Sequence, residues 1–143
     1  MRKNQGVGET EKHDYSRNDF SIEFRGDYIY VIHAPDFEIT PDSKARLWSA
    51  LAVECETYNC RRVLTEGKRV RREMSFLEVF DSAKQLSNII PGLRLAFCFE
   101  NYPQDELTGF FKTAASNRGV KINFFSDCRE ALGWLGVEDS KFN

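Results

Sequence analysis

Two hydrophobic periods alternate along the chain from Phe20 onward, and this alternation constrains the fold more than any other feature. Apolar side chains recur at every second position in short segments, as in Phe20, Ile22 and Phe24, and at helical spacing in longer ones, as in Leu47 and Leu51. The predicted strands are residues 20–24, 28–33, 61–66, 93–100 and 120–125, and the predicted helices lie near residues 41–58, 76–86, 107–114 and 128–135. The predicted order is β-β-α-β-α-β-α-β-α.

Helices between successive strands predict parallel pairing through right-handed crossovers. In the strand that starts at Leu93, apolar side chains alternate with Arg94, Ala96, Cys98 and Glu100, which indicates one buried face and one thinly covered face. A sheet wound in a single direction carries its crossover helices on one face. We therefore expect an α/β domain with a five-stranded, mostly parallel sheet, an N-terminal β-hairpin and four helices mainly on one face.

The thinly covered face suggests self-association. Leu64, Ala96 and Cys98 fall on it, together with either Ile29 or Val31 from a neighbouring strand, because residues two apart on a strand share a side. A small apolar patch of this kind on a soluble domain usually marks an interface, and two-fold dimers are the commonest result. The sequence predicts a homodimer through this patch, unless the N-terminal segment or long charged side chains cover it.

Length and composition limit the chain to one domain. With 143 residues, 41% of them hydrophobic, we expect a domain over residues 20–137, a disordered extension over the polar residues 1–19 and a short tail over residues 138–143. A net charge of −2 argues against a general nucleic-acid binder, and no apolar run reaches the roughly 20 residues that a membrane span needs. We expect a cytoplasmic protein.

The sequence carries no recognisable catalytic or metal motif. The four cysteines have no paired spacing and are expected to be reduced thiols, and no nucleophile elbow, Walker loop, dinucleotide fingerprint or histidine-rich set occurs. His33 and Asp36 form the best remaining catalytic pair, although a histidine at the end of a strand more often has a structural role. We expect no enzymatic activity, cofactor or metal.

Residues 66–80, "EGKRVRREMSFLEVF", raise two questions about the start of the second helix. Ser75 followed by Glu78 reads as a capping box, yet a phosphate on Ser75 would also suit a helix N-terminus next to arginines. The basic residues that precede it are Lys68, Arg69, Arg71 and Arg72. They could form an anion-binding lip for a phosphorylated metabolite or an acidic partner surface, or they could be solvated loop charge.

The order of the elements over residues 20–137 resembles the STAS superfamily, which includes the anti-sigma-factor antagonists. The segments "PGLRLAFCFE", "FFKTAASNRGVKINFFSD" and "EALGWL" are similar to a little-characterised bacterial group of STAS-like proteins. The resemblance implies a module that binds other proteins, without a bound cofactor or a reaction. In that family the phosphorylated serine lies at the start of the second helix, where Ser75 is the nearest match, although Met74 and Phe76 depart from the family motif.

Two functions follow from these observations. The first is a regulatory protein-interaction module of STAS type that uses the thinly covered sheet face and residues 67–75. The second is a carrier or sensor of a small apolar or lipid-like ligand, because the lipid-transfer fold of the CRAL-TRIO type looks similar at this level. A closed apolar pocket of several hundred Å³ would favour the carrier, and a filled core with an exposed patch would favour the interaction module.

Overall fold

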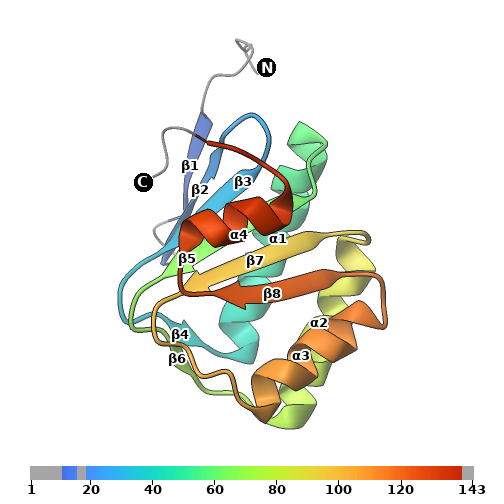
Figure 1. Cartoon of the computed structure of the whole chain (residues 1–143). Coiled ribbons are helices and arrows are strands. Elements are labelled where there is room, and N and C mark those ends of the chain that lie inside the picture. Colours follow the sequence, from blue (N-terminus) through green and yellow to red (C-terminus); the bar gives the residue numbers. More distant parts are fainter. Residues whose placement is uncertain (1–10, 16–18, 140–143) are drawn as a thin grey trace.

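The computed structural model describes residues 11–15 and 19–139 and shows a main sheet flanked by helices (Figure 1). The strands of the main sheet are β1 (Glu11–Tyr15), β2 (Phe20–Phe24), β3 (Ile29–His33), β5 (Arg62–Gly67), β7 (Arg94–Phe99) and β8 (Lys121–Phe125). The helices are α1 (Pro41–Tyr58), α2 (Phe76–Ile89), α3 (Glu106–Ser116) and α4 (Cys128–Leu135). Two short strands, β4 (Glu38–Ile39) and β6 (Arg71–Arg72), pair with each other beside the main sheet.

The strand order confirms the predicted α/β class. The main sheet runs β1-β2-β3-β5-β7-β8, with antiparallel pairing from β1 to β3 and parallel pairing from β3 to β8. All five predicted strands are present, and β2 and β3 form the expected hairpin. Because β3, β5, β7 and β8 are neighbours in chain order, the crossovers through α1, α2 and α3 wind in one direction, as the sequence indicated.

Local sequence signals determine where the helices begin. Thr40 caps α1, with Pro41 at the first helical position and a reciprocal bond between Thr40 and Ser43. The helix ends at Asn59, which adopts the left-handed conformation that asparagine tolerates better than most residues. The extent of α1 therefore matches the prediction, because cap residues mark both of its ends.

The larger hydrophobic core lies between the sheet and the helices α1, α2 and α3. Every second side chain of the central strands points into it, including Val63 from β5 and Leu95, Phe97 and Phe99 from β7. Trp48 of α1 is fully buried there. This face of the sheet accounts for most of the buried apolar surface and fixes the register of the parallel strands.

The opposite face of the sheet is covered by α4, so the predicted interface is wrong. Leu64 and Ala96 are fully buried and Cys98 is 6% exposed, because they pack against Ala131 and Leu132 of α4. In Figure 1, α4 crosses the face of the sheet that α1, α2 and α3 leave open. These side chains cannot form the apolar patch of a dimer, and the predicted dimer is left without the surface assigned to it.

The observed register also corrects which side chains of the neighbouring strand β3 lie on the α4 face. Leu64 pairs with Tyr30, so the side chains of β3 on the α4 face are those of Tyr30 and Tyr28. Ile29 and Val31, offered as alternatives for this face, point into the larger core. The alternation of side chains was predicted correctly, but the pairing register decides which residues are neighbours across strands.

A disulfide between Cys98 and Cys128 ties the first residue of α4 to β7. The expectation that these two cysteines are reduced thiols is therefore wrong, since sequence spacing does not show which residues meet across a sheet face. Cys55 and Cys60 are free thiols.

The domain boundaries extend further than the sequence indicated. Residues 11–15 were assigned to the disordered extension, yet they form β1 and pair with β2 along its length. Asp139, assigned to the C-terminal tail, accepts hydrogen bonds from the Tyr28 hydroxyl at 2.6 Å and from Arg25 at 3.2 Å. The rest of the two predicted terminal segments, residues 1–10, 16–18 and 140–143, lies outside the described residues.

The disulfide gives the first prediction. Cys128→Ser should lower the free energy of unfolding of the oxidised protein by about 3 kcal/mol, because a cross-link over a sequence separation of 30 residues restricts the unfolded chain. Urea unfolding without reductant measures this loss. Cys60→Ser is the matched control and should cost less than about 1 kcal/mol. A titration that finds all four thiols free in the folded wild-type protein would contradict the assignment.

Candidate functional site

Three of the four basic residues before α2 are paired with carboxylates of the same chain, and the anion-binding lip stays a prediction. Arg69 donates to Asp36 at 3.0 Å and Arg71 donates to Glu38 at 2.9 Å, and both ion pairs are well exposed. The Arg69 guanidinium holds the pKa of Asp36 below its usual range. These two ion pairs join the segment around β4 to the segment around β6. Both arginines are therefore paired with carboxylates of the same chain. Lys68 is exposed and lies outside these pairs.

Arg72 differs from the other three because its side chain turns inward. Its guanidinium donates to both carboxylate oxygens of Asp105, at 2.7 and 3.2 Å, and to the Thr108 hydroxyl at 3.1 Å. The side chain is 17% exposed. The ion pair holds the pKa of Asp105 well below its usual range, and Asp105 also caps α3 by accepting from the backbone of Thr108. Arg72 thus fixes the start of α3 to the strand before α2.

Ser75 caps α2 in the way the sequence predicted. Its hydroxyl accepts from the Glu78 backbone at 3.2 Å, and the Glu78 carboxylate accepts from the Ser75 backbone at 2.9 Å. Ser75 is exposed. The cap accounts for a serine here without a modification, and the nearby Arg72 is already paired with Asp105. Phosphorylation of Ser75 stays a prediction.

An exposed apolar surface lies directly after Ser75. Phe76 is 51% exposed and Leu77 is 69% exposed, although both are large apolar side chains. Phe76 and Phe80 of α2 contact Phe110 of α3, with ring centroids 5.5 and 6.3 Å apart. We call the surface of these four side chains the Phe76 patch. It brings the starts of two helices together, which the sequence pattern did not indicate.

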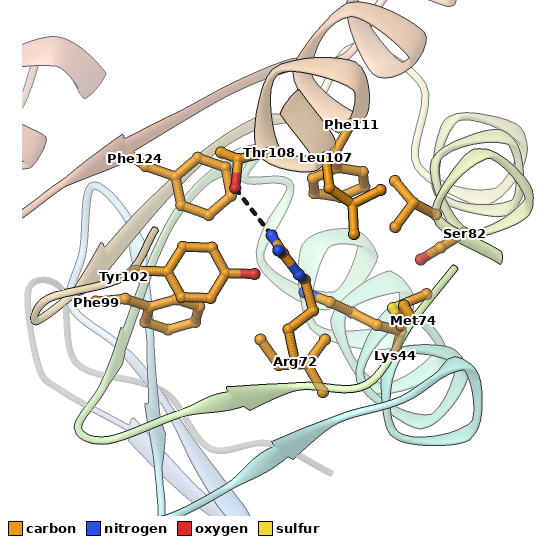
Figure 2. A pocket seen from close by; sticks show the side chains of 12 residues that line it. Lys44, Arg72, Met74, Ser82, Phe99, Tyr102, Leu107, Thr108, Phe111 and Phe124 are labelled. Atoms are coloured by element: carbon orange, nitrogen blue, oxygen red, sulfur yellow. Dashed lines mark hydrogen bonds between the residues drawn. The ribbon is translucent and has the colours of Figure 1, made fainter. Parts of the chain in front are cut away.

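A pocket lies between α1, β6, α2, α3 and the strands β7 and β8 (Figure 2). Its walls are mainly apolar and aromatic, and its charged members are Lys44 and Arg72. The lining residues are Ile39, Lys44, Arg72, Met74, Val79, Ser82, Phe99, Tyr102, Leu107, Thr108, Phe111 and Phe124. The cavity volume is about 20 Å³, which is room for about one water molecule. We call this the Lys44 pocket.

Lys44 is the unusual residue of this pocket. It is 7% exposed, and its ammonium nitrogen lies over the rings of Phe97, Trp48 and Phe111 at 4.5, 4.8 and 5.6 Å from their centroids. Within residues 19–139 the ammonium has no carboxylate within ion-pair distance and no hydrogen bond. Burial lowers the pKa of Lys44 to about 7. Lys44 was not predicted as a site residue, although its place one turn before Leu47 and Trp48, on the apolar stripe of the helix, was an available signal.

His33 and Asp36 do not form a catalytic pair. His33 is 5% exposed and stacks on Phe37 with ring centroids 4.1 Å apart, whereas Asp36 is exposed and paired with Arg69. Burial, with a contribution from the Lys44 charge, lowers the pKa of His33 to about 3. The histidine is a neutral core residue, which was the alternative stated from the sequence.

The described residues contain neither a metal-binding cluster nor a membrane-spanning helix. No three His, Cys, Asp or Glu side chains of residues 11–15 and 19–139 come together in a way that could hold a metal ion. None of the helices in this part of the chain is both long and apolar enough to cross a membrane.

Comparison with known proteins finds similar folds among solved structures but no sequence relative. No family model and no curated protein matches the sequence. A crystal structure from Shewanella loihica PV-4, described as an uncharacterized protein from the DUF3478 family with a SpoIIAA-like fold, is similar to this chain. The identity is 18%, the alignment covers 94% of this chain and 98% of that chain, and the TM-score is 0.49.

The cap at Ser75 gives the second prediction. Ser75→Ala should lower the free energy of unfolding by roughly 1 kcal/mol, because the backbone amide of Glu78 loses its acceptor. Ser75→Asp should retain most of the stability, since a carboxylate also caps a helix and suits its N-terminus. Urea unfolding of the three proteins measures both effects. Equal stability of all three would contradict the capping role.

Lys44 gives the third prediction. Its folded-state pKa of about 7 lies below the usual lysine value of 10.5, so the unfolded state binds more protons between these pH values and stability rises with pH across this window. Lys44→Met should therefore raise the free energy of unfolding at pH 7 by roughly 1–3 kcal/mol, the range for a buried polar group without a partner. The difference from wild type should shrink as the pH approaches 10.5.

Denaturant unfolding between pH 6 and 10 measures this dependence. Lys84→Met, which changes an exposed lysine of α2, is the matched control and should have little effect at any pH. If Lys44→Met were less stable than wild type throughout, the ammonium would have a stabilising partner and the description of the pocket would be wrong.

Proposed function

We propose that this chain is a non-enzymatic, regulatory protein-interaction module of STAS type, and that its contact surface is the Phe76 patch. The single observation that carries the proposal is the exposure of two adjacent large apolar residues, Phe76 at 51% and Leu77 at 69%, at the start of α2. Exposed apolar side chains at neighbouring positions favour a contact with another macromolecule, because leaving them in water has an unfavourable hydration free energy.

The geometry of the patch suits a protein partner. Phe76 of α2 packs against Phe110 of α3, and the ion pair of Arg72 and Asp105 fixes the start of α3 to the strand before α2, so the apolar side chains stand on a firmly packed base. A rigid aromatic anchor on such a base is typical of residues that contribute most to binding.

The charges around the patch suggest what the partner carries. Glu73, Glu78 and Glu106 are exposed near the starts of α2 and α3. Arg72, the last residue of β6, is neutralised by Asp105, and Arg118 places one positive charge over the Phe80 ring, 5.1 Å from its centroid, so these three carboxylates outnumber it. We therefore propose a partner that offers an apolar side chain surrounded by lysines or arginines, since complementary charge steers association and fixes orientation.

Ser75 is the proposed point of regulation. Its exposed hydroxyl lies next to Phe76 in sequence and close to the carboxylate of Glu78. A phosphate there would add a charge of about −1.5 to −2 beside the apolar contact and near existing carboxylates. Hydration of the phosphate would oppose burial of the apolar contact, whereas its charge would attract the basic rim proposed for the partner, so phosphorylation would change the affinity for that partner.

The alternative, a carrier of an apolar or lipid-like ligand, has less support. The Lys44 pocket has a volume of about 20 Å³, whereas pockets for drug-sized ligands are typically about 300–1,000 Å³. A lipid tail would need the side chains of the core to move apart. The interaction module needs no such change.

The fourth prediction tests the patch. A photo-crosslinking amino acid at position 77, in cells of the source organism, should capture one protein partner that the same amino acid at position 53 does not capture. Val53 is a fair control because it is also a large, exposed apolar residue, 60% exposed, but lies on α1. The purified partner should then bind Leu77→Gln at least about tenfold more weakly than wild type, a loss expected for one apolar anchor.

The control variant Val53→Gln should bind the partner as wild type does. Both glutamines favour helix, so neither variant should unfold the domain. Equal capture at positions 77 and 53, or equal affinity of Leu77→Gln and wild type for the purified partner, would contradict the proposal.

A further inference from the structure

The buried ammonium of Lys44 lacks a counter-ion. It is held over three aromatic rings whose faces attract a cation, but within residues 19–139 no carboxylate lies within 4.0 Å of it. A buried charge in a protein is ordinarily paired, because its burial without a partner costs several kcal/mol. Figure 2 shows Lys44 reaching from α1 into the same pocket that Arg72 enters from β6.

The charges of the pocket do not balance. Lys44 and Arg72 are two cations, and Asp105 is the one carboxylate that bonds to either of them in the described chain. The ion pair of Arg72 and Asp105 has no net charge, so one positive charge remains at Lys44 when its amine is protonated. A single monoanion would neutralise it.

We propose that the Lys44 pocket binds the carboxylate of a small organic acid between Lys44 and Arg72. The ammonium of Lys44 would form an ion pair with the carboxylate deep in the pocket. The guanidinium of Arg72 would donate a hydrogen bond to the same carboxylate from the mouth of the pocket. The Ser82 hydroxyl accepts from the Trp48 ring nitrogen at 3.0 Å, so its own hydrogen is available to a carboxylate oxygen. This site lies beyond the proposed protein interaction and does not depend on it.

The walls of the pocket indicate the rest of the ligand. Apart from the polar groups named above, they are formed by apolar and aromatic side chains, which suit a short hydrocarbon tail. The present volume of about 20 Å³ admits about one water molecule, so a tail of a few carbons must displace a flexible side chain such as Met74 or Leu107. Inorganic phosphate fits less well, because its second charge and its many hydrogen-bond acceptors would meet apolar walls. The ligand class is therefore a short-chain monocarboxylate.

The fifth prediction uses sodium butyrate as the probe. Titration of the full, isotope-labelled chain at pH 6 should give saturable shifts of backbone amide signals around Lys44, Arg72 and Thr108. Butyramide, which has the same shape without the charge, should bind at least about tenfold more weakly, since it cannot make the charge-assisted hydrogen bonds. Inorganic phosphate at equal concentration should not displace butyrate.

Two variants locate the site. Lys44→Met keeps the apolar stem and should fold, but it should bind butyrate at least about tenfold more weakly than wild type. Arg71 is the exposed residue next to Arg72 in β6, and it does not line the pocket. Arg71→Gln should therefore bind butyrate as wild type does.

The proposal would be overturned by any of three results. These are no saturable shift with butyrate at millimolar concentrations, equal affinity for butyrate and butyramide, or unchanged binding by Lys44→Met. Because the titration contains no protein partner, its failure would leave the proposed interaction at the Phe76 patch unaffected, and the reverse also holds.

Discussion

The register between β3, β5 and β7 is the constraint on which the rest of the structure depends. Leu64 lies between Tyr30 and Ala96, and this pairing directs one set of side chains toward α1, α2 and α3 and the other toward α4. A slip of one residue would exchange the two sets. This one arrangement determines the two hydrophobic cores and the disulfide of Cys98. It also determines where each strand ends and the following helix begins.

Winding in one direction leaves the second sheet face without crossover helices, and the chain covers that face with α4. The helix has only eight residues, which is short for independent stability, and it depends on the apolar contacts of Leu132 and Leu135 and on the covalent link from Cys128. The chain beyond α4 continues along the same side, where Asp139 bonds to Tyr28. The face that could have been an open surface is therefore a second, smaller core.

The surfaces with proposed functions gather at one end of the parallel sheet. Loops after β5 and β7 lead into the starts of α2 and α3, where Arg72 and Asp105 join the two segments. The Phe76 patch is formed by side chains of α2 and α3, and Arg72 of this junction also lines the Lys44 pocket (Figure 2). In parallel α/β sheets, the ends of the strands at which the helices begin are the usual place for binding sites, because the loops there converge while the strands hold them rigidly.

The sequence by itself determined the elements and their winding. Apolar alternation gave five strands, cap residues such as Thr40 and Ser75 set the starts of two helices, and the succession of helix and strand gave the parallel, one-way sheet. These signals are local, so they can be found without knowing which segments meet. β1 was missed because its residues lack an apolar alternation.

Tertiary structure alone decided which faces are buried and which charges are free. The sequence showed Cys98 and Cys128 as unrelated thiols and the basic residues before α2 as one cluster. In the folded chain the cysteines are bonded, and Arg69, Arg71 and Arg72 each have a different carboxylate. Among residues 19–139 Lys44 has none, although it is buried. Pairing between residues distant in sequence depends on how the sheet register and helix packing bring side chains together, and no local pattern in a single sequence encodes that distance.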